Sequence, residues 1–546
     1  MERRLVLAVT LMIAVLVVPS FFMKHAPRRP NAVADSAAVA TGQAAGQRTP
    51  ATSAAPARAA LDTAATRADT ALISDPSAVY RITGAGATID RAVFPQLRNF
   101  HPGERGPASI VRPGDRLLVH RIIAGSDTIR FDSTRFSVAQ GAGEVRLSGT
   151  AGAVTEALRI AVAPGNPYLL DVTGSLDGLS GRGATLVVGL GSGFANVEAD
   201  SLDNYRKYAV AVRRTTPENV NFRSVAPGQV RTIDGPFDWV AVKSKYFMAT
   251  ILSADSARPQ LGGAVMIGGE RPGRYAVLAQ TWVTMPVGPD GHFHYQLYLG
   301  PQQHRVVHPM GRELDRASPY GWIFKPIVMP VATWITAFFL WLHEHLHVSY
   351  GLILVLFGVI VRLALWPLNQ RAMKSQIAMM AVQPILKDIQ ERYKNDPQKL
   401  QSEMMRVYKE HGVNPLGGCL PLFLPLPILL ALFFVFSNTI ELRGTPFLWL
   451  PDLSLKDPLF ITPLAMGGSM FVLSKLSQKG MPPNPQAKMM TVFMPIMMTV
   501  MFMNFASGLN LYYAVSNLVS LPQQWLINKS RSAEMARRQV SGGSKS

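Results

Sequence analysis

An apolar run at residues 350–365 carries one full charge, Arg362, and this combination limits what the chain can fold into. The run reads YGLILVLFGVIVRLAL, which is typical of a membrane-spanning helix, and Trp366-Pro367 follows it. An ionised guanidinium in hydrocarbon costs roughly 2.5–3.5 kcal/mol. Two interpretations stay open. Arg362 is a functional group facing protein or water, or it reaches the interface, because it lies roughly 7 Å of helix rise from the Trp-Pro end.

The apolar residues of the chain are concentrated at one end. Residues 25–320 are mixed and polar, whereas the remainder carries long runs of Leu, Met, Phe, Ile and Pro. The formal charge is +19, but no compact Lys/Arg block interleaved with aromatic residues occurs, so nucleic-acid binding has little support. The single cysteine, Cys419, excludes an intramolecular disulfide and a cysteine-cluster metal site.

The N-terminal 24 residues are predicted to form an uncleaved transmembrane anchor. Two arginines precede an uncharged stretch, and Phe21, Phe22 and Met23 stand where a cleaved signal peptide requires small residues. Residues 25–78 are rich in Ala, Thr, Pro and Ser, with almost no large apolar side chains. Such a stretch cannot bury enough surface to offset its ordering entropy, so we expect a disordered linker.

Residues 79–310 have a different pattern. Short alternating runs such as RLLVHRII and RYAVLAQTWVTM are separated by Gly, Pro, Asn and Asp turns, which predicts a many-stranded antiparallel sandwich or barrel. The segment contains no nucleophile elbow, phosphate loop or metal-spaced cluster, and we expect its scattered Asp, Glu and His residues to form a solvated face. It is interpreted as a binding or scaffolding domain.

Residues 320–347 combine two prolines, several aromatic residues and one lysine, and are predicted to form an interfacial amphipathic helix. Its end contains His343-Glu344-His345-Leu346-His347, which satisfies the H-E-x-x-H pattern of zinc proteases. The favoured interpretation is a histidine-rich turn at the membrane edge, because no further ligand motif follows. A membrane zinc protease using His343, Glu344 and His347 stays open as an alternative.

A polar block at residues 369–412 follows the first apolar run. Its periodicity predicts two amphipathic helices, with a turn at residues 394–397. The block carries eight basic and five acidic residues and should therefore be cytoplasmic. Four further apolar segments follow, at residues 416–440, 459–476, 489–506 and 509–527. If the basic loops between the apolar segments lie in the cytoplasm, the N-terminus is also cytoplasmic and the β domain lies on the opposite side of the membrane.

The last apolar segment carries polar residues at a helical spacing. Asn510, Tyr513, Asn517 and Gln524 follow i, i+3, i+7 and i+14, which places them along one stripe of a helix. Residues of this kind commonly hydrogen-bond between helices in a bundle. Together with an intramembrane arginine, the stripe is also compatible with a water-filled cavity.

Several motifs in the C-terminal half resemble those of YidC-type membrane protein insertases. They occur in order at residues 413–419 (VNPLGGC), 441–443 (ELR), 446–447 (PF), 449 (W), 452–454 (DLS), 457–458 (DP), 507–508 (SG), 511–513 (LYY) and 516–517 (SN). The resemblance covers about residues 320–530. The β-rich segment resembles the large periplasmic domain of Gram-negative members in placement and texture.

The resemblance implies an α-helical polytopic membrane protein with a β-supersandwich periplasmic domain. The N-terminal anchor would be followed by a five-helix insertase core at residues 348–530, which includes the hairpin 369–412, and by a basic cytoplasmic tail at residues 531–546. Family members enclose a hydrophilic groove open to cytoplasm and lipid. Its arginine corresponds to Arg362, and Tyr513, with its neighbour Tyr512, corresponds to a substrate-contacting position. Some members carry a threonine where this chain has Gly358.

The function implied is insertion and folding of nascent membrane proteins in the bacterial inner membrane, without enzymatic catalysis, cofactor or metal. The expected groove residues are Arg362, Asn510, Tyr512, Tyr513, Asn517 and Gln524. Expected partners are nascent clients, the Sec translocon with its accessory subunits, the lipid bilayer, and the ribosome through the hairpin and the tail. An ion-coupled transporter is the alternative from another class, although the spans hold no Asp or Glu and show no inverted repeat.

Overall fold

The computed structural model describes residues 70–179, 183–255, 260–271, 277–318, 324–413, 426–479 and 485–542. The predicted anchor and most of the predicted linker lie outside these residues. The chain divides into two compact units. One contains residues 378–413 of the described chain, and the other contains the β-rich segment and the remaining helices.

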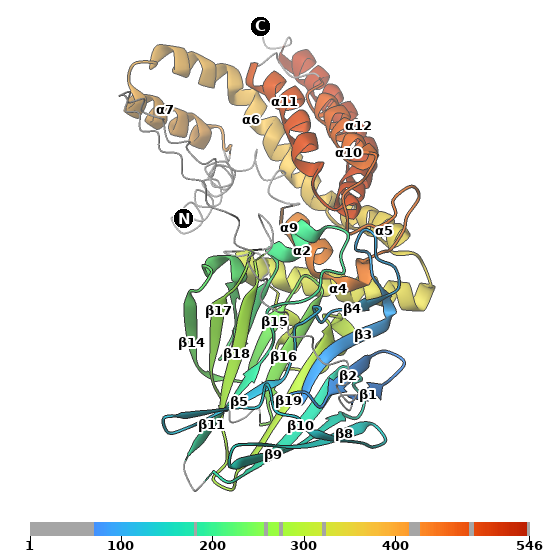
Figure 1. Ribbon diagram of the computed structural model, residues 1–546. Coiled ribbons are helices and arrows are strands. Elements are labelled where there is room, and N and C mark those ends of the chain that lie inside the picture. The colour runs from blue at the N-terminus through green and yellow to red at the C-terminus, as the bar shows by residue number, and fades with distance from the viewer. Residues whose placement is uncertain are drawn as a thin grey trace, which may run out of the picture. The chain divides into compact units, whose positions relative to one another are not determined.

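The β-rich segment is built from three antiparallel sheets within the described residues (Figure 1). The nine-stranded sheet has the order β13 (Pro217–Asn221), β12 (Ala209–Arg213), β15 (Trp239–Lys243), β16 (Phe247–Ser253), β19 (His292–Pro301), β10 (Leu169–Asp177), β9 (Val154–Val162), β8 (Glu144–Ala151) and β7 (Ser137–Gln140). The six-stranded sheet has the order β14 (Val230–Phe237), β17 (Leu261–Gly268), β18 (Ala279–Pro286), β11 (Ala184–Gly189), β5 (Val119–Ala124) and β6 (Asp127–Arg130). The four-stranded sheet contains β1 (Thr70–Ser74), β2 (Val79–Thr83), β3 (Thr88–Arg98) and β4 (Pro107–Ser109).

Burial along the strands explains how the sequence forms this sandwich. Outer strands such as β8 alternate buried and exposed residues, as the period of two requires for a sheet with one solvated face. The central strands β15 and β16 are buried at every position, which explains their continuous apolar runs. One core of buried side chains joins residues of all three sheets. The predicted antiparallel β-sandwich architecture is confirmed.

Two expectations for this segment are wrong. Strand β1 lies inside the stretch expected to be disordered linker, because Ala71 and Ile73 alternate with exposed residues and are buried against the core. The scattered charged residues do not all form a solvated face. His120, Glu156 and Asp238 are buried inside the domain, where His120 Nδ1 lies 2.6 Å from Glu156 Oε1. Both features are hard to predict from sequence. A short strand among small residues lacks a clear alternating pattern, and a buried charge depends on a partner that is distant along the chain.

Helices dominate the chain after the β segment. The β-rich segment also contains short helical elements: α2 (Ser201–Arg206), α3 (His304–Val307) and the 3-10 turns η1 (Phe222–Ser224) and η2 (Leu314–Arg316). The longer helices are α4 (Lys325–Leu346), α5 (Tyr350–Ala364), α6 (Trp366–Arg392), α7 (Pro397–Glu410), α9 (Leu426–Asn438), α10 (Ile461–Ser477), α11 (Pro485–Phe502) and α12 (Ser507–Gly542), with a 3-10 turn η5 (Ile440–Leu442) after α9. Helix α4 packs on α9, α5 packs on α12, and α10 packs on both α11 and α12. The predicted helical C-terminal half is confirmed.

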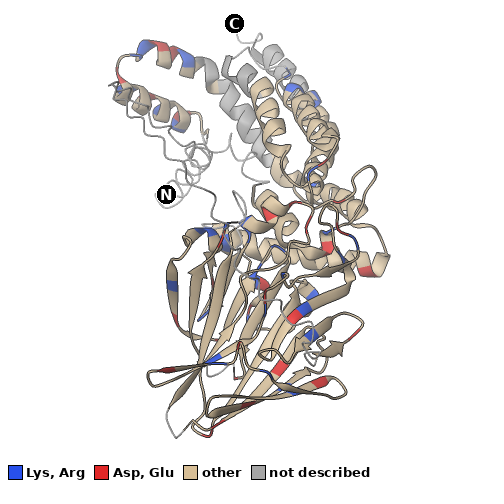
Figure 2. Cartoon of the chain, in the orientation of Figure 1, with Lys and Arg blue, Asp and Glu red and all other residues tan. Residues whose placement is uncertain are grey.

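Helices α5 and α11 each expose an apolar surface that is unusual for a helix in contact with water. Exposed side chains on α5 (Leu352, Leu356, Ile360, Leu363) and on α11 (Phe493, Ile496, Met497, Val500, Met501) each follow one helical stripe. Figure 2 shows few charged side chains on α9, α10 and the described part of α11, in contrast to α7 and the β domain. Contiguous apolar stripes of this kind favour contact with lipid.

Fewer of the described helices are long enough to cross a membrane than are apolar enough to do so. Among the residues that the structure describes, one helix, α4, is both long and apolar enough to cross a membrane, and α5, α9 and residues 491–502 are shorter apolar helices. The five-span count and the interfacial position of α4 therefore stay predictions. Helix α12 continues to Gly542, well past the predicted end of the last apolar segment.

The hairpin unit contains the second half of α6 and all of α7. Asp396 caps α7 by accepting the Lys399 N–H at 3.0 Å, and Pro397 occupies the first turn, where its missing N–H leaves no bond unmade. A small cluster of Val382, Leu386, Val407 and Val413 holds the two helices together. The turn lies where residues 394–397 were expected to form it.

Candidate functional site

Arg362 lies in the last turn of α5, on a different face of the helix from its exposed apolar stripe. Its residue is half-buried, and its Nε–H donates a hydrogen bond to Ser516 Oγ on α12 at 2.7 Å. The guanidinium also lies within electrostatic reach of the hydroxyls of Tyr512 and Tyr513. A cation at a helix C-terminus interacts favourably with the helix dipole. Among the described residues, no carboxylate forms an ion pair with Arg362.

The face of α12 that meets Arg362 is polar and buried. Tyr512, Ser516, Ser520 and Gln523 follow i, i+4, i+8 and i+11, and each is buried. Ser520 Oγ donates to the Ser516 carbonyl at 2.7 Å, and the Gln523 amide lies 3.5 Å from the Trp366 carbonyl. The Tyr512 ring packs on Phe357 of α5, with ring centroids 5.9 Å apart. This stripe joins α5 to α12 around the arginine.

Gly358, one helical turn before Arg362, allows α5 and α12 to approach closely. A Cβ placed on Gly358 would lie 3.2 Å from Val515 Cγ1 and 3.7 Å from the Tyr512 ring. The first separation is tighter than an ordinary van der Waals contact, so a larger residue requires Val515 to move. The absence of a side chain at Gly358 therefore permits the present spacing of the two helices beside Arg362.

The stripe predicted from the sequence faces another side of α12. Asn510 Nδ2 donates to the Phe502 carbonyl at 3.1 Å, and Asn517 Nδ2 donates to Ser469 Oγ on α10 at 3.2 Å. Gln524 Nε2 lies 3.4 Å from Asn528 Oδ1 on the same helix. The contacts of Asn510 and Asn517 are interhelical bonds of the kind that amides commonly make in membrane bundles, whereas that of Gln524 stays within α12.

The structure thus brings together only part of the predicted set. Tyr512 and Tyr513 lie near Arg362, and the Tyr513 ring also packs edge-on against Phe502 at 5.5 Å. The amides of Asn510 and Asn517 bond to neighbours on α11 and α10 instead. Sequence reasoning missed Ser516, although its spacing of four residues from Tyr512 places both on one helix face.

The H-E-x-x-H segment is not arranged as a zinc site. Helix α4 ends at Leu346, and His347 adopts a left-handed conformation with φ of 51°, so His343 and His347 do not share a helix face. The His343 ring stacks on Tyr350 at 4.3 Å and donates to the Val348 carbonyl at 2.8 Å. Glu344 forms an ion pair with Arg305. The protease alternative therefore has no geometric support.

A second arginine, Arg443, occupies the junction between the β domain and the loop after α9. Its Nε donates to Glu198 Oε2 at 2.7 Å and its Nη2 donates to the Val197 carbonyl at 2.9 Å. The guanidinium also lies 4.6 Å above the centre of the Phe100 ring. Burial raises the pKa of Glu198 above its usual range, while the neighbouring guanidinium opposes this rise. These contacts hold the loop onto the β domain.

Lys243 is another buried basic residue of the β domain, but its surroundings differ from those of Arg443. Lys243 is buried at the end of β15, and its ammonium donates to Ser318 Oγ at 2.8 Å. Burial lowers the pKa of Lys243 to about 7, because a charged ammonium is poorly solvated there. Nearby Lys207 adds to this decrease. No described carboxylate forms an ion pair with it.

Comparisons with known proteins cover nearly the whole chain. Residues 73–342 match the family model described as the YidC periplasmic domain, and residues 341–534 match the model described as the 60Kd inner membrane protein. The membrane protein insertase YidC of Chlorobaculum tepidum is 30% identical over an alignment of 573 positions, gaps included, which spans 97% of this chain and 95% of the relative.

Other relatives align over shorter regions. The insertase YidC of Chlorobium phaeovibrioides is 38% identical over 317 residues, 54% of this chain and 52% of the relative, so that alignment spans about half the relative's length. A solved structure titled "Active YidC insertase crystal structure with the first transmembrane domain resolved" has 18% identity and a TM-score of 0.35, and covers 84% of this chain and 93% of that one. On the near full-length match at 30% identity, this chain belongs to the YidC family of membrane protein insertases.

Proposed function

We propose that the chain inserts nascent membrane proteins into the bacterial inner membrane, and that Arg362 receives the polar segment of a client. One observation carries this proposal. Arg362 lies among apolar helices and bonds to a hydroxyl, so its positive charge is available to an incoming carboxylate. The names of the relatives, which are those of an insertase, agree with the prediction that the chain is not an enzyme.

The magnitudes support this role for the charge. Moving an acidic side chain to the bilayer centre costs roughly 2.5–3.5 kcal/mol on insertion scales. A carboxylate about 4 Å from a guanidinium gains roughly 4 kcal/mol at an effective dielectric constant of about 20. The two terms are comparable, so a client's acidic segment would lose little free energy while it lies beside Arg362. Its apolar segment would meanwhile enter lipid along the exposed apolar stripes of the helices.

The client site proposed here is narrower than the one expected from the sequence. It consists of Arg362 on α5 with Ser516, which accepts its hydrogen bond, and with Tyr512 and Tyr513, which lie near its guanidinium on α12. Asn510 and Asn517 are assigned to packing of α12 against its neighbours, because their amides bond to α11 and α10. Gln524 is left out of the client site as well, because its amide bonds to Asn528 within α12.

The partners and the orientation extend the same proposal. The N-terminus and the net-basic hairpin 369–412 would lie in the cytoplasm, where the hairpin and the basic tail 531–546 would meet the ribosome. The β domain would lie in the periplasm and the Sec translocon would act beside the helices. The helical core would span the membrane five times, and α4 would lie along the interface with the lipid bilayer.

The test compares two clients that differ only in the charge of the translocated tail. Reconstituted full-length protein with Arg362→Ala should insert the acidic-tailed client roughly ten-fold less, equal to about 1.4 kcal/mol, and the neutral-tailed client almost normally. Arg362→Lys keeps the charge and should retain most insertion. Arg130→Ala, an exposed arginine of the β domain, is the matched control. Protease protection of the tails measures insertion, and equal loss for both clients would contradict the proposal.

A further inference from the structure

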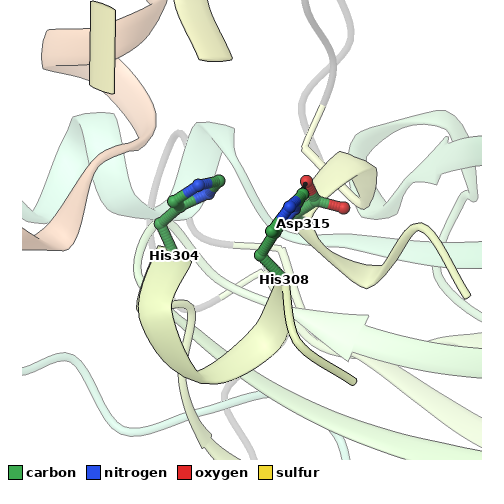
Figure 3. A group of neighbouring side chains, drawn as sticks. All are labelled: His304, His308 and Asp315. Atoms are coloured by element: carbon green, nitrogen blue, oxygen red, sulfur yellow. Dashed lines mark hydrogen bonds and ion pairs between the residues drawn. The ribbon is translucent and has the colours of Figure 1, made fainter. Parts of the chain in front are cut away.

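Two histidines and an aspartate gather beside the last strand of the β domain. His304 and His308 are four residues apart at α3, and Asp315 belongs to the 3-10 turn η2 (Figure 3). Each offers a ligand atom, and these atoms all lie within 4.8 Å of one another. His308 Nδ1 is 2.9 Å from Asp315 Oδ2, and the two imidazole rings stack with centroids 4.8 Å apart. Two imidazoles and a carboxylate form a donor set that suits zinc.

The backbone on both sides of this cluster is held by the β domain. Val307 and Leu314 are buried in its core. Arg312 begins a turn with two left-handed residues, and Trp239 Nε1 donates to its carbonyl at 2.8 Å. The Arg312 guanidinium donates in turn to the Ser253 carbonyl at 2.7 Å. The three donors are therefore positioned by packed structure rather than by free loops, as a specific metal site requires.

A polar cavity adjoins the cluster and contains an unpaired acceptor. His304 and Asp315 line a cavity of about 30 Å³ together with Glu441, which belongs to the turn after α9. Glu441 Oε1 accepts the His304 backbone N–H at 2.9 Å, but its Oε2 is buried and has no hydrogen-bond partner among the described residues. This volume is enough for a water molecule, which could also serve as a ligand of a bound ion. A buried unpaired carboxylate oxygen is costly unless a donor or a cation reaches it.

We propose that His304, His308 and Asp315 bind a divalent transition-metal ion, with zinc as the best fit, and that Glu441 lies next to its open coordination position. Zinc bonds of about 2.0–2.1 Å in a tetrahedron place ligand atoms roughly 3.3 Å apart. The ligand atoms now lie within 4.8 Å of one another, so metal binding would draw them together by at most about 1.5 Å. His308 would bind as the neutral ring with its proton on Nε2, and the metal would replace its contact with Asp315.

Such an ion would connect three segments of the chain. It would join α3 to η2 directly, and through the His304 N–H and Glu441 it would stiffen the turn after α9. The inference does not depend on insertion activity, because it concerns the β domain and its junction. It also differs from the H-E-x-x-H hypothesis, since none of its ligands belongs to that motif.

The test measures zinc binding to the full-length protein, purified in detergent after removal of metal with a chelator. Calorimetry and competition with a chromophoric chelator should show about one equivalent of Zn²⁺ bound at micromolar or tighter affinity. His304→Ala with His308→Ala should weaken binding at least about ten-fold, and Asp315→Asn should weaken it measurably. His294→Ala is the matched control, because His294 pairs with Asp171 on the same domain but has no third ligand nearby among the described residues.

Two further measurements make each outcome decisive. X-ray absorption at the zinc edge should report nitrogen and oxygen ligands at about 2.0–2.1 Å. His343→Ala with His347→Ala should leave the bound zinc unchanged. Thermal unfolding in chelator identifies any variant that fails to fold, and His308→Gln alone then replaces it. Absence of stoichiometric zinc in the wild type, or equal binding in the wild type and the His304/His308 variant, would overturn the proposal.

Discussion

Two arginines in this chain are placed in opposite surroundings. Arg443, at the junction of the β domain, has a side chain only 3% exposed and is paired with Glu198, backbone and two aromatic rings. Arg362, among the helices, is half-buried and bonds to the hydroxyl of Ser516. The first guanidinium has its charge matched inside the protein. The guanidinium of Arg362 bonds to a neutral hydroxyl, so its charge can still pair with an acidic group of a client.

The difference shows how burial decides what a charge is used for. Burying one partner of an ion pair without the other leaves an uncompensated charge, so Arg443 and Glu198 can only act together. A guanidinium that still reaches water can exchange water for a client carboxylate at small cost. The junction is therefore a structural contact, whereas the helical site is suited to temporary binding.

Glu198→Gln should have the largest effect on stability. It keeps the shape of the side chain but leaves Arg443 buried without a counter-charge, which should cost roughly 3–5 kcal/mol. Thermal unfolding of the full-length protein measures the loss. Glu144→Gln, whose pair with Arg159 lies at the surface of the β domain, is the control and should change stability much less than Glu198→Gln. A small loss in Glu198→Gln would mean that Arg443 also reaches solvent.

Lys243→Met tests a buried cation that has no carboxylate. With the folded-state pKa of Lys243 at about 7 and the unfolded value near 10.5, the unfolded chain binds more protons between these pH values. Wild-type stability should then rise with pH from about 7 to 10, by at most roughly 1.4 kcal/mol per pH unit. Lys243→Met should lack this rise and be more stable than the wild type at pH 7. Parallel curves for the two proteins, from urea unfolding across this range, would show that Lys243 is not the source.

Ser516→Ala should have the smallest effect on stability. Water can replace the lost hydroxyl beside the half-buried guanidinium, so the loss should stay below about 1 kcal/mol. Ser520→Ala is the matched control, because its hydroxyl bonds to the Ser516 carbonyl of the same helix and not to Arg362. Both are measured by thermal unfolding in detergent. A loss as large as that of Glu198→Gln would show that Arg362 is sealed from water and would weaken its proposed role.

The sequence predicts the two-part architecture well, because strand alternation and apolar helices are local patterns. It also identifies Arg362, since a charge in an apolar run is visible without a structure. It does not identify Ser516, because which face of α12 meets α5 depends on how α9 and α10 pack on its other faces. The Arg443–Glu198 pair is 245 residues apart along the chain, and no local pattern indicates such a partner.

The tight spacing at Gly358 has a consequence for how relatives of this chain can diverge. Val515 faces the position where a side chain at 358 would begin, at 3.2 Å from the missing Cβ. A relative with threonine at the position of Gly358 then needs a smaller residue opposite it, or a wider gap between the two helices. The two positions should consequently substitute as a correlated pair, and lineages that widen the gap should move the arginine farther from the serine that now holds it.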